Sequence, residues 1–275
     1  MIVDTHVHVI AEDQRQYPRT PAAANTEWVR DLTAESLLAL MEEAGIGRTI
    51  LVQAHGAYQY NNNYAADCAR KYSGSFASVC IVDALEKDAA DQLSYWVNER
   101  GVRGLRLFDL GRRRSWLDQP ATFSLWERAR SLGIPVCVCT RWRNLPLLHA
   151  PLVRFPEIPF ALDHLGLPRL DRGAPYEAVM PLFEMARFPN VYLKFSTVSI
   201  DEASRGKSSP KDFFQRLLER FGPQRMMWGS NYPATYDRSL QQQLELAREE
   251  LSFISTEDQR WLFSETALTL WPELR

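Results

Sequence analysis

Short apolar segments alternate with longer amphipathic segments along almost the whole chain. The short segments are rich in Val, Ile, Leu and Phe, and several lack a strict alternation of apolar and polar residues. This composition is typical of parallel strands that are covered on both faces. We therefore predict eight strands, at Ile2–Val9, Thr49–Gln53, Phe76–Val82, Gly104–Phe108, Pro135–Thr140, Pro159–Leu162, Val191–Phe195 and Arg225–Trp228.

The longer segments repeat apolar residues at the spacing of a helix that packs on one face. In the segment Leu32–Ala44 the side chains of Leu37, Leu38 and Met41 share a face, and Gly45 is expected to end the helix. A last helix, at Ser255–Leu270, is expected to pack outside the repeat. The other predicted helices are Leu32–Ala44, Asp88–Arg100, Phe123–Leu132, Leu147–Phe155 (weakened by Pro151), Tyr176–Arg187, Lys211–Phe221 and Ser239–Leu251.

Eight strand–helix units in 275 residues favour a (β/α)8 TIM barrel of the α/β class, with an extra C-terminal helix. We expect residues 1–275 to form a single domain, because no shift in composition marks a boundary. The alternative is a doubly wound sheet, but no glycine-rich loop follows the first strand.

Composition limits the partners and the compartment. The formal charge of -2 comes from 32 basic and 34 acidic residues and argues against a nucleic-acid surface. No stretch approaches the roughly 18 apolar residues that span a bilayer, and no signal peptide is apparent. The four cysteines are interpreted as small core residues rather than as a disulfide framework. We expect a cytoplasmic protein without nucleic-acid or membrane partners; a homo-oligomer is left open.

Four of the five histidines fall where predicted strands end, which is where TIM barrels carry their chemistry. His6 and His8 follow the first strand, His55 the second and His164 the sixth. Residues two apart on a strand point to the same side, so His6 and His8 are both expected to face the barrel interior. There they can bind one ion or one substrate oxygen. His149, in a weak helix, is interpreted as structural.

Four segments at these strand ends resemble signatures of the amidohydrolase superfamily. They are Asp4-Thr5-His6-Val7-His8, Asp163-His164-Leu165-Gly166, Val191-Tyr192-Leu193-Lys194-Phe195-Ser196 and Trp228-Gly229-Ser230-Asn231-Tyr232-Pro233. The chain resembles the amidohydrolase-2 type, in the branch that includes 2-pyrone-4,6-dicarboxylate lactonase and L-fuconolactonase. The resemblance covers almost the whole chain. It implies a barrel that hydrolyses lactones, esters or amides, or that decarboxylates aromatic acids.

The metal-binding pattern of the superfamily is only partly present. Of the ligands in its fullest form, His6, His8 and His164 match. The fourth strand offers Arg106 instead of an acidic group, and the fifth has no histidine. The resemblance therefore implies either no metal or one divalent ion, such as zinc, on His6, His8 and His164.

Asn231 stands where the family has an aspartate that acts as a general base. An amide cannot accept a proton near neutral pH, so that role is lost. One explanation is that another group, such as His164, His55 or His8, serves as the base, and this is slightly favoured. The others are that the enzyme is weak or altered, or that Asn231 is an isosteric replacement that traps a substrate.

The predicted function is hydrolysis of a small, anionic lactone by histidine-assisted attack of water. The alternatives are a metal-dependent decarboxylase of an aromatic acid and an impaired small-molecule binder. A carboxylate-bearing substrate fits because guanidinium groups bind carboxylates in a bidentate manner, whereas the run Arg112–Arg114 is interpreted as a solvated face. The predicted catalytic residues are His6, His8, His164, Asn231 and Lys194. The predicted substrate-binding residues are Arg106, Arg141, His55, Gln53, Tyr58, Trp142, Ser196 and Tyr232.

Overall fold

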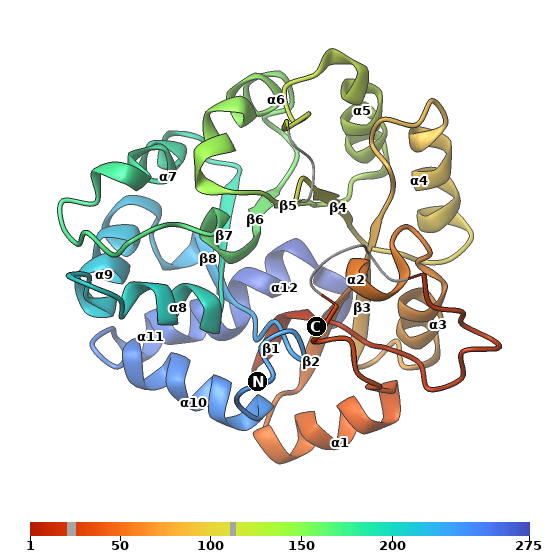
Figure 1. Ribbon diagram of the computed structural model, residues 1–275, viewed down its shortest axis with the longest axis horizontal. Coiled ribbons are helices and arrows are strands. Elements are labelled where there is room, and N and C mark those ends of the chain that lie inside the picture. Colours follow the sequence, from red (N-terminus) through yellow and green to blue (C-terminus); the bar gives the residue numbers. More distant parts are fainter. Residues whose placement is uncertain (21–25, 111–113) are drawn as a thin grey trace.

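Eight parallel strands form the centre of the computed structural model, which describes residues 1–20, 26–110 and 114–275 (Figure 1). Each strand pairs with the next in chain order. The predicted (β/α)8 architecture is therefore confirmed. The strands are β1 (Val3–Val7), β2 (Arg48–Val52), β3 (Phe76–Ile81), β4 (Leu105–Phe108), β5 (Val136–Cys139), β6 (Phe160–Leu162), β7 (Val191–Phe195) and β8 (Met226–Trp228).

The barrel is joined between β8 and β1 at the carboxyl ends of these strands. The backbone N–H of Asn231 donates to the carbonyl of His6 at 2.8 Å, and the N–H of His8 donates to the carbonyl of Tyr232 at 2.9 Å. Gly229 permits this approach, because a Cβ at that position would lie 2.7 Å from the Cβ of His6. The seam therefore places Asn231 directly beside the two histidines of the first strand.

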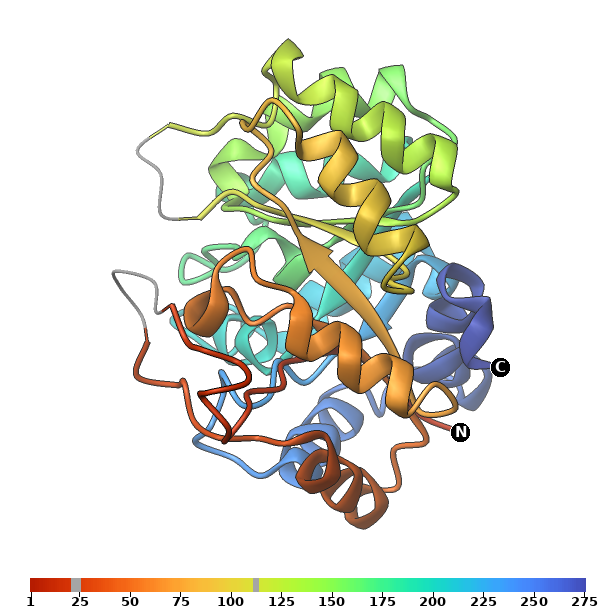
Figure 2. The ribbon, with the colours of Figure 1, turned by 90° about the vertical axis from the view of Figure 1, so that its right-hand side faces the viewer.

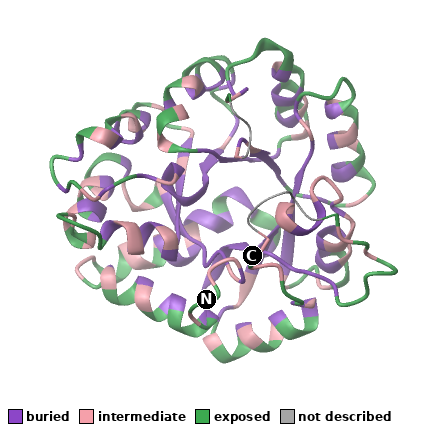
Figure 3. Ribbon diagram, in the orientation of Figure 1, coloured by how far each residue is buried: buried purple, intermediate pink, exposed green. Residues whose placement is uncertain are grey.

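Helices surround the strands, and most of them have one buried face (Figures 1 and 3). In α1, Thr33 caps the N–H of Ser36 and Gly45 ends the helix at a φ of 69°. The helices are α1 (Ala34–Ala44), α2 (His55–Tyr58), α3 (Asn63–Lys71), α4 (Ala89–Asn98), α5 (Phe123–Leu132), α6 (His149–Arg154), α7 (Met180–Glu184), α8 (Thr197–Ala203), α9 (Pro210–Phe221), α10 (Leu240–Glu250), α11 (Thr256–Arg260) and α12 (Thr266–Leu270).

Some helices differ from the sequence prediction. The segment expected at 176–187 contains only the short α7 between two 3-10 turns, and the segment expected at 255–270 is divided by a π-helical turn at 261–265. The helix α3 was not predicted, because its buried side chains are the small residues Ala65, Ala66, Cys68 and Ala69. Small side chains make the segment polar on average, although its apolar residues do lie on one face.

The two ends of the barrel are covered differently. In Figure 2 the arrow of β3 points away from the side on which both chain termini lie. The C-terminal segment packs at that side, where Leu268, Leu270 and Trp271 share a hydrophobic cluster with inward residues of the strands. No described helix has the length and apolar character needed to cross a membrane.

Candidate active site

Three histidines meet at the carboxyl end of the barrel. His6 lies on β1, His8 directly follows this strand, and His164 follows β6. The ring centroids of His6 and His8 are 5.1 Å apart, and those of His6 and His164 are 4.6 Å apart. All three are buried, with exposed fractions of 6% or less. The structure therefore brings these predicted residues into one cluster.

Left-handed backbone conformations position two of the site residues. His164 has a φ of 53° and Asn231 a φ of 63°. Asn and His tolerate this region better than most residues, although it costs of order 1–3 kcal/mol. The hydrogen bonds on both sides of Asn231 at the seam hold it in this conformation. Strain of this kind concentrates at functional sites.

A buried carboxylate, Asp163, connects Arg106, Lys194 and His6. The Nε–H of Arg106 donates to Asp163 Oδ2 at 2.7 Å. Asp163 Oδ1 lies 3.4 Å from Lys194 Nζ and 3.5 Å from His6 Nδ1. The guanidinium also reaches His6, with its Nη2 at 3.4 Å from Nε2. Asp163 was absent from the predicted site, although it directly precedes His164 in one of the signature segments.

The charges in this network are mutually stabilised. Burial alone would raise the pKa of Asp163, but Lys194, Arg106 and His6 hold it well below its usual range. Burial acts to lower the pKa of Lys194, yet its contacts with Cys137 and Asp163 raise it above its usual value. Two cations and one carboxylate are therefore charged at neutral pH.

The imidazoles, by contrast, are neutral at pH 7. Burial lowers the pKa of His8 to about 4 and that of His164 to about 3, and it lowers the pKa of His6 well below its usual value. His8 Nδ1 lies 2.8 Å from the carbonyl oxygen of Val52. A carbonyl only accepts, so Nδ1 carries the hydrogen and Nε2 keeps the lone pair. The Asn231 side chain hydrogen-bonds to this His8 ring.

Ser196 and Asp4 complete the inner part of the site. Ser196 follows β7, and its Oγ lies 2.9 Å from Nδ1 of His164. Asp4 Oδ1 accepts the backbone N–H groups of His6 and Ser230, at 3.0 and 2.9 Å. Burial raises the pKa of Asp4 to about 6. Asp4 therefore ties β1 to the segment that carries Asn231.

Two predicted substrate-binding residues, Gln53 and Tyr58, make contacts within the surrounding loops. The side-chain amide of Gln53 donates to the carbonyls of Gln59 and Asn61, at 3.2 and 2.6 Å. The Tyr58 hydroxyl accepts the backbone N–H of Ala11 at 2.7 Å. These bonds fix the segments after β1 and β2, which stand beside the histidines.

The remaining predicted binding residues follow strands at the same end of the barrel as the cluster. His55 is half-buried and stacks on Phe108, with ring centroids 4.3 Å apart, and burial lowers its pKa to about 4. Tyr232 is partly buried at the seam, next to Asn231. Trp142 is half-buried and Arg141 is exposed, both after β5. Arg114 is exposed, whereas Arg112 and Arg113 lie outside the described residues.

The three histidines do not fit a divalent metal ion. The Nη2 of Arg106 lies 3.4 Å from Nε2 of His6, which places a permanent positive charge where a cation would bind. Within the part of the chain that the structure describes, no three His, Cys, Asp or Glu side chains come together as a metal site. The charge pattern favours an anion.

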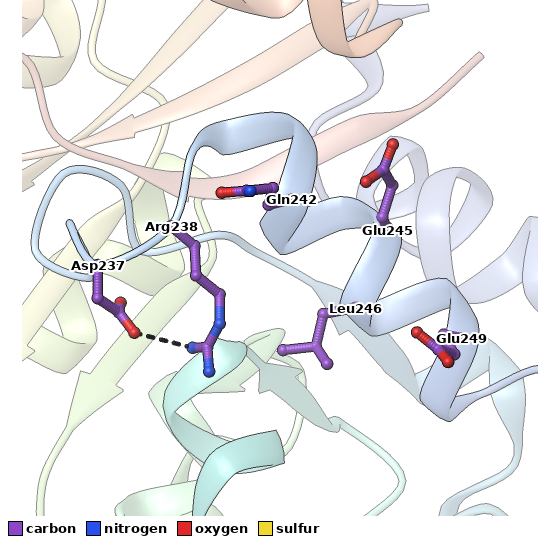
Figure 4. A pocket seen from close by; sticks show the side chains of 6 residues that line it. All are labelled: Asp237, Arg238, Gln242, Glu245, Leu246 and Glu249. Atoms are coloured by element: carbon purple, nitrogen blue, oxygen red, sulfur yellow. Dashed lines mark ion pairs between the residues drawn. The ribbon is translucent and has the colours of Figure 1, made fainter.

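A surface pocket of about 320 Å³ lies apart from this cluster, against α10 (Figure 4). Its six lining residues include no histidine. Arg238 forms ion pairs with Asp237 and Asp201, and Glu245 and Glu249 make the remaining wall acidic. This pocket lacks the chemistry of the barrel centre, and we do not assign the site to it.

Known proteins share the fold and part of the sequence. The L-fucono-1,5-lactonase of Burkholderia ambifaria is 25% identical over 236 residues, which cover 85% of this chain and 80% of the relative. An amidohydrolase structure from Burkholderia multivorans with bound zinc has a TM-score of 0.80 at 22% identity and covers 99% of both chains. A 2,6-dihydroxybenzoate decarboxylase from Rhizobium has a TM-score of 0.73 at 16% identity, covering 98% of both. The two structures confirm the fold.

The match to a family extends over nearly the whole sequence. Residues 3–272 match the amidohydrolase family. The matched range contains all eight strands and every residue of the histidine cluster. The chain therefore belongs to the amidohydrolase family of hydrolases.

Proposed function

We propose that this protein hydrolyses a small lactone that carries a carboxylate. The observation that carries the proposal is the buried guanidinium of Arg106, which lies among neutral imidazoles at the strand ends. A guanidinium can bind a carboxylate or polarise a carbonyl oxygen. The name of the 25%-identical relative, an L-fucono-1,5-lactonase, supports a cyclic ester as the substrate class.

In the proposed reaction, the carbonyl oxygen of the lactone binds beside Arg106, and His6 and His164 line the same position. Negative charge develops on this oxygen when water attacks. A fixed cation in a site without bulk water stabilises that charge strongly. Water is held by Asn231, next to His8, whose Nε2 carries a lone pair. His8 accepts the proton of the water and returns it to the ring oxygen, which leaves as a hydroxyl group when the C–O bond of the lactone breaks.

The direct test is a panel of sugar lactones and of lactones that carry a carboxylate, assayed with the purified protein and its His164→Ala variant. We expect hydrolysis by the wild-type protein and a loss of about 50-fold in kcat/KM for the variant, because an imidazole facing the carbonyl is removed. His149→Ala is the matched control, since His149 is exposed on α6. Unchanged activity of His164→Ala would remove this histidine from the site.

The decarboxylase alternative predicts a dependence on a bound metal ion. The site does not fit such an ion, because Arg106 approaches the ring nitrogen that a metal would use. We therefore expect dialysis against a chelator to leave lactone hydrolysis within about twofold of its starting rate. Elemental analysis of the dialysed protein is the control that shows metal removal. Loss of activity that added zinc restores would contradict the expectation.

A further inference from the structure

Lys194 is directed into the barrel and bonds to other groups of the protein. Its ammonium donates to the carbonyl of Thr5 at 3.1 Å and lies 3.4 Å from Asp163 Oδ1. It also hydrogen-bonds to the thiol of Cys137 and lies 5.2 Å from the ring centroid of Trp271. Trp271 belongs to the C-terminal segment at the opposite end of the barrel. The Lys194 ammonium is therefore held by other groups of the protein inside the barrel.

Asp163 accepts one hydrogen bond through Oδ2 and has two ion-pair contacts at Oδ1, and each of these contacts comes from a different strand. Oδ2 accepts from Arg106 on β4, while Oδ1 faces Lys194 on β7 and His6 on β1. The side chain is completely buried. An arginine side chain has several rotatable bonds, and a charge-assisted bond to its Nε fixes the plane of the guanidinium.

The same contacts define the hydrogen positions of His6. Arginine only donates, so the nitrogen that faces Arg106, Nε2, is the acceptor of the ring. Nδ1 then carries the hydrogen, and it faces Asp163 Oδ1. One carboxylate thus fixes the orientation of the cation, and the cation sets the tautomer of its neighbouring imidazole.

We propose that Asp163 is a positioning residue that orients Arg106 toward the substrate and, through Arg106, sets the tautomer of His6, with Lys194 as its buried counter-ion. The proposal rests on the proposed function, because Arg106 is assigned there to the carbonyl oxygen. A purely structural role is the competing explanation. In that case Asp163 only neutralises Lys194 inside the barrel, and its bond to Arg106 has no effect on catalysis.

Two double variants separate these explanations. Asp163→Ala/Lys194→Met and Asp163→Asn/Lys194→Met each remove one positive and one negative charge, so neither changes the net charge of the cluster. They differ in one property: asparagine keeps an oxygen that can accept the Nε–H of Arg106, whereas alanine does not. A single Asp163→Ala change is unsuitable, because it leaves two cations buried without their carboxylate.

We expect kcat/KM for the lactone to fall about 50-fold in the alanine double variant, with most of the loss in kcat, because a misplaced group costs transition-state stabilisation. The asparagine double variant is expected to stay within about fivefold of the wild type. Circular dichroism and Tm check that both variants fold. Equal kcat/KM values for the two double variants would overturn the proposal, as would wild-type activity in the alanine variant.

A second measurement does not depend on activity. The Nε–H resonance of Arg106 in a 1H–15N spectrum, assigned by its absence in Arg106→Lys, is expected to exchange slowly with water in the wild type and in the asparagine double variant. In the alanine double variant we expect exchange at least tenfold faster. Similar exchange in all three proteins would also overturn the proposal.

If the wild type hydrolyses no lactone, the proposed function fails, yet this resonance still tests the positioning role. Cys137→Ala, which removes another contact of Lys194, is the control expected to leave it unchanged.

Discussion

Arg106→Met is expected to reduce kcat/KM for a lactone substrate by about 1,000-fold, because single preorganised donors at a developing oxyanion are worth about 100- to 1,000-fold. The guanidinium is buried against His6 and Asp163, where its charge is poorly screened. Removal of this cation leaves Asp163 paired with Lys194 alone, a balanced pair that permits folding. Steady-state kinetics and a thermal melt of the same preparation measure both effects.

Two further variants control this experiment. Arg106→Lys keeps the positive charge but loses the planar guanidinium group. Its kcat/KM is therefore expected to be only about tenfold higher than that of Arg106→Met. Arg169→Met makes the same chemical change at an exposed arginine that pairs with Asp171, and it is expected to leave the kinetics unchanged. A kcat/KM within tenfold of wild type for Arg106→Met would exclude Arg106 from the reaction.

Asn231→Asp is expected to raise kcat by about 100-fold, the usual range of a well-placed general base being about 100- to 10,000-fold. Asn231 contacts His8 and stands at the seam between β8 and β1. A carboxylate there can take the proton of the attacking water directly. The φ of 63° is compatible with aspartate, which shares the tolerance of asparagine for this region. Single-turnover and steady-state rates on the same lactone measure the change.

The comparison with Asn231→Ala identifies what the amide does in the wild-type protein. If Asn231 orients water for His8, Asn231→Ala is expected to lower kcat by about tenfold. Equal rates for the wild type and Asn231→Asp would remove position 231 from proton transfer. Turnover found only in Asn231→Asp would instead show that the wild-type chain is a binder with impaired catalysis.

Much of the fold follows from local patterns. Apolar runs placed all eight strands within a few residues of their observed positions, because strands covered on both faces are continuously apolar. The helix α3 was not predicted because its buried face consists of small alanine and cysteine side chains, and the segment is polar on average. The segments at 176–187 and 255–270 have amphipathic patterns but contain interrupted helices, and such interruptions depend on packing that a pattern does not report.

The site was predicted less completely than the fold. Its histidines could be located because they follow strands, and the carboxyl ends of all barrel strands meet at one end. Asp163 was missed because the spacing of residues in the sequence does not mark an aspartate next to a candidate histidine as a site residue. Lys194 was expected at the reaction centre, whereas its ammonium lies beneath Asp163 and bonds to Thr5. The direction of the Lys194 side chain along the barrel axis depends on neighbouring residues from other strands.

The sequence by itself determined the barrel, the family and the residue types at the strand ends, because these depend on local composition and spacing. Only the tertiary structure decided how those residues are bonded. Arg106 and Asp163 are 57 residues apart in the chain, and His8 and the carbonyl of Val52 are 44 apart. Hydrogen-bond partners, tautomers and charges arise from contacts between distant strands, inside a core that excludes water. For that reason the neutral imidazoles and the fixed guanidinium of this site became visible only in the folded protein.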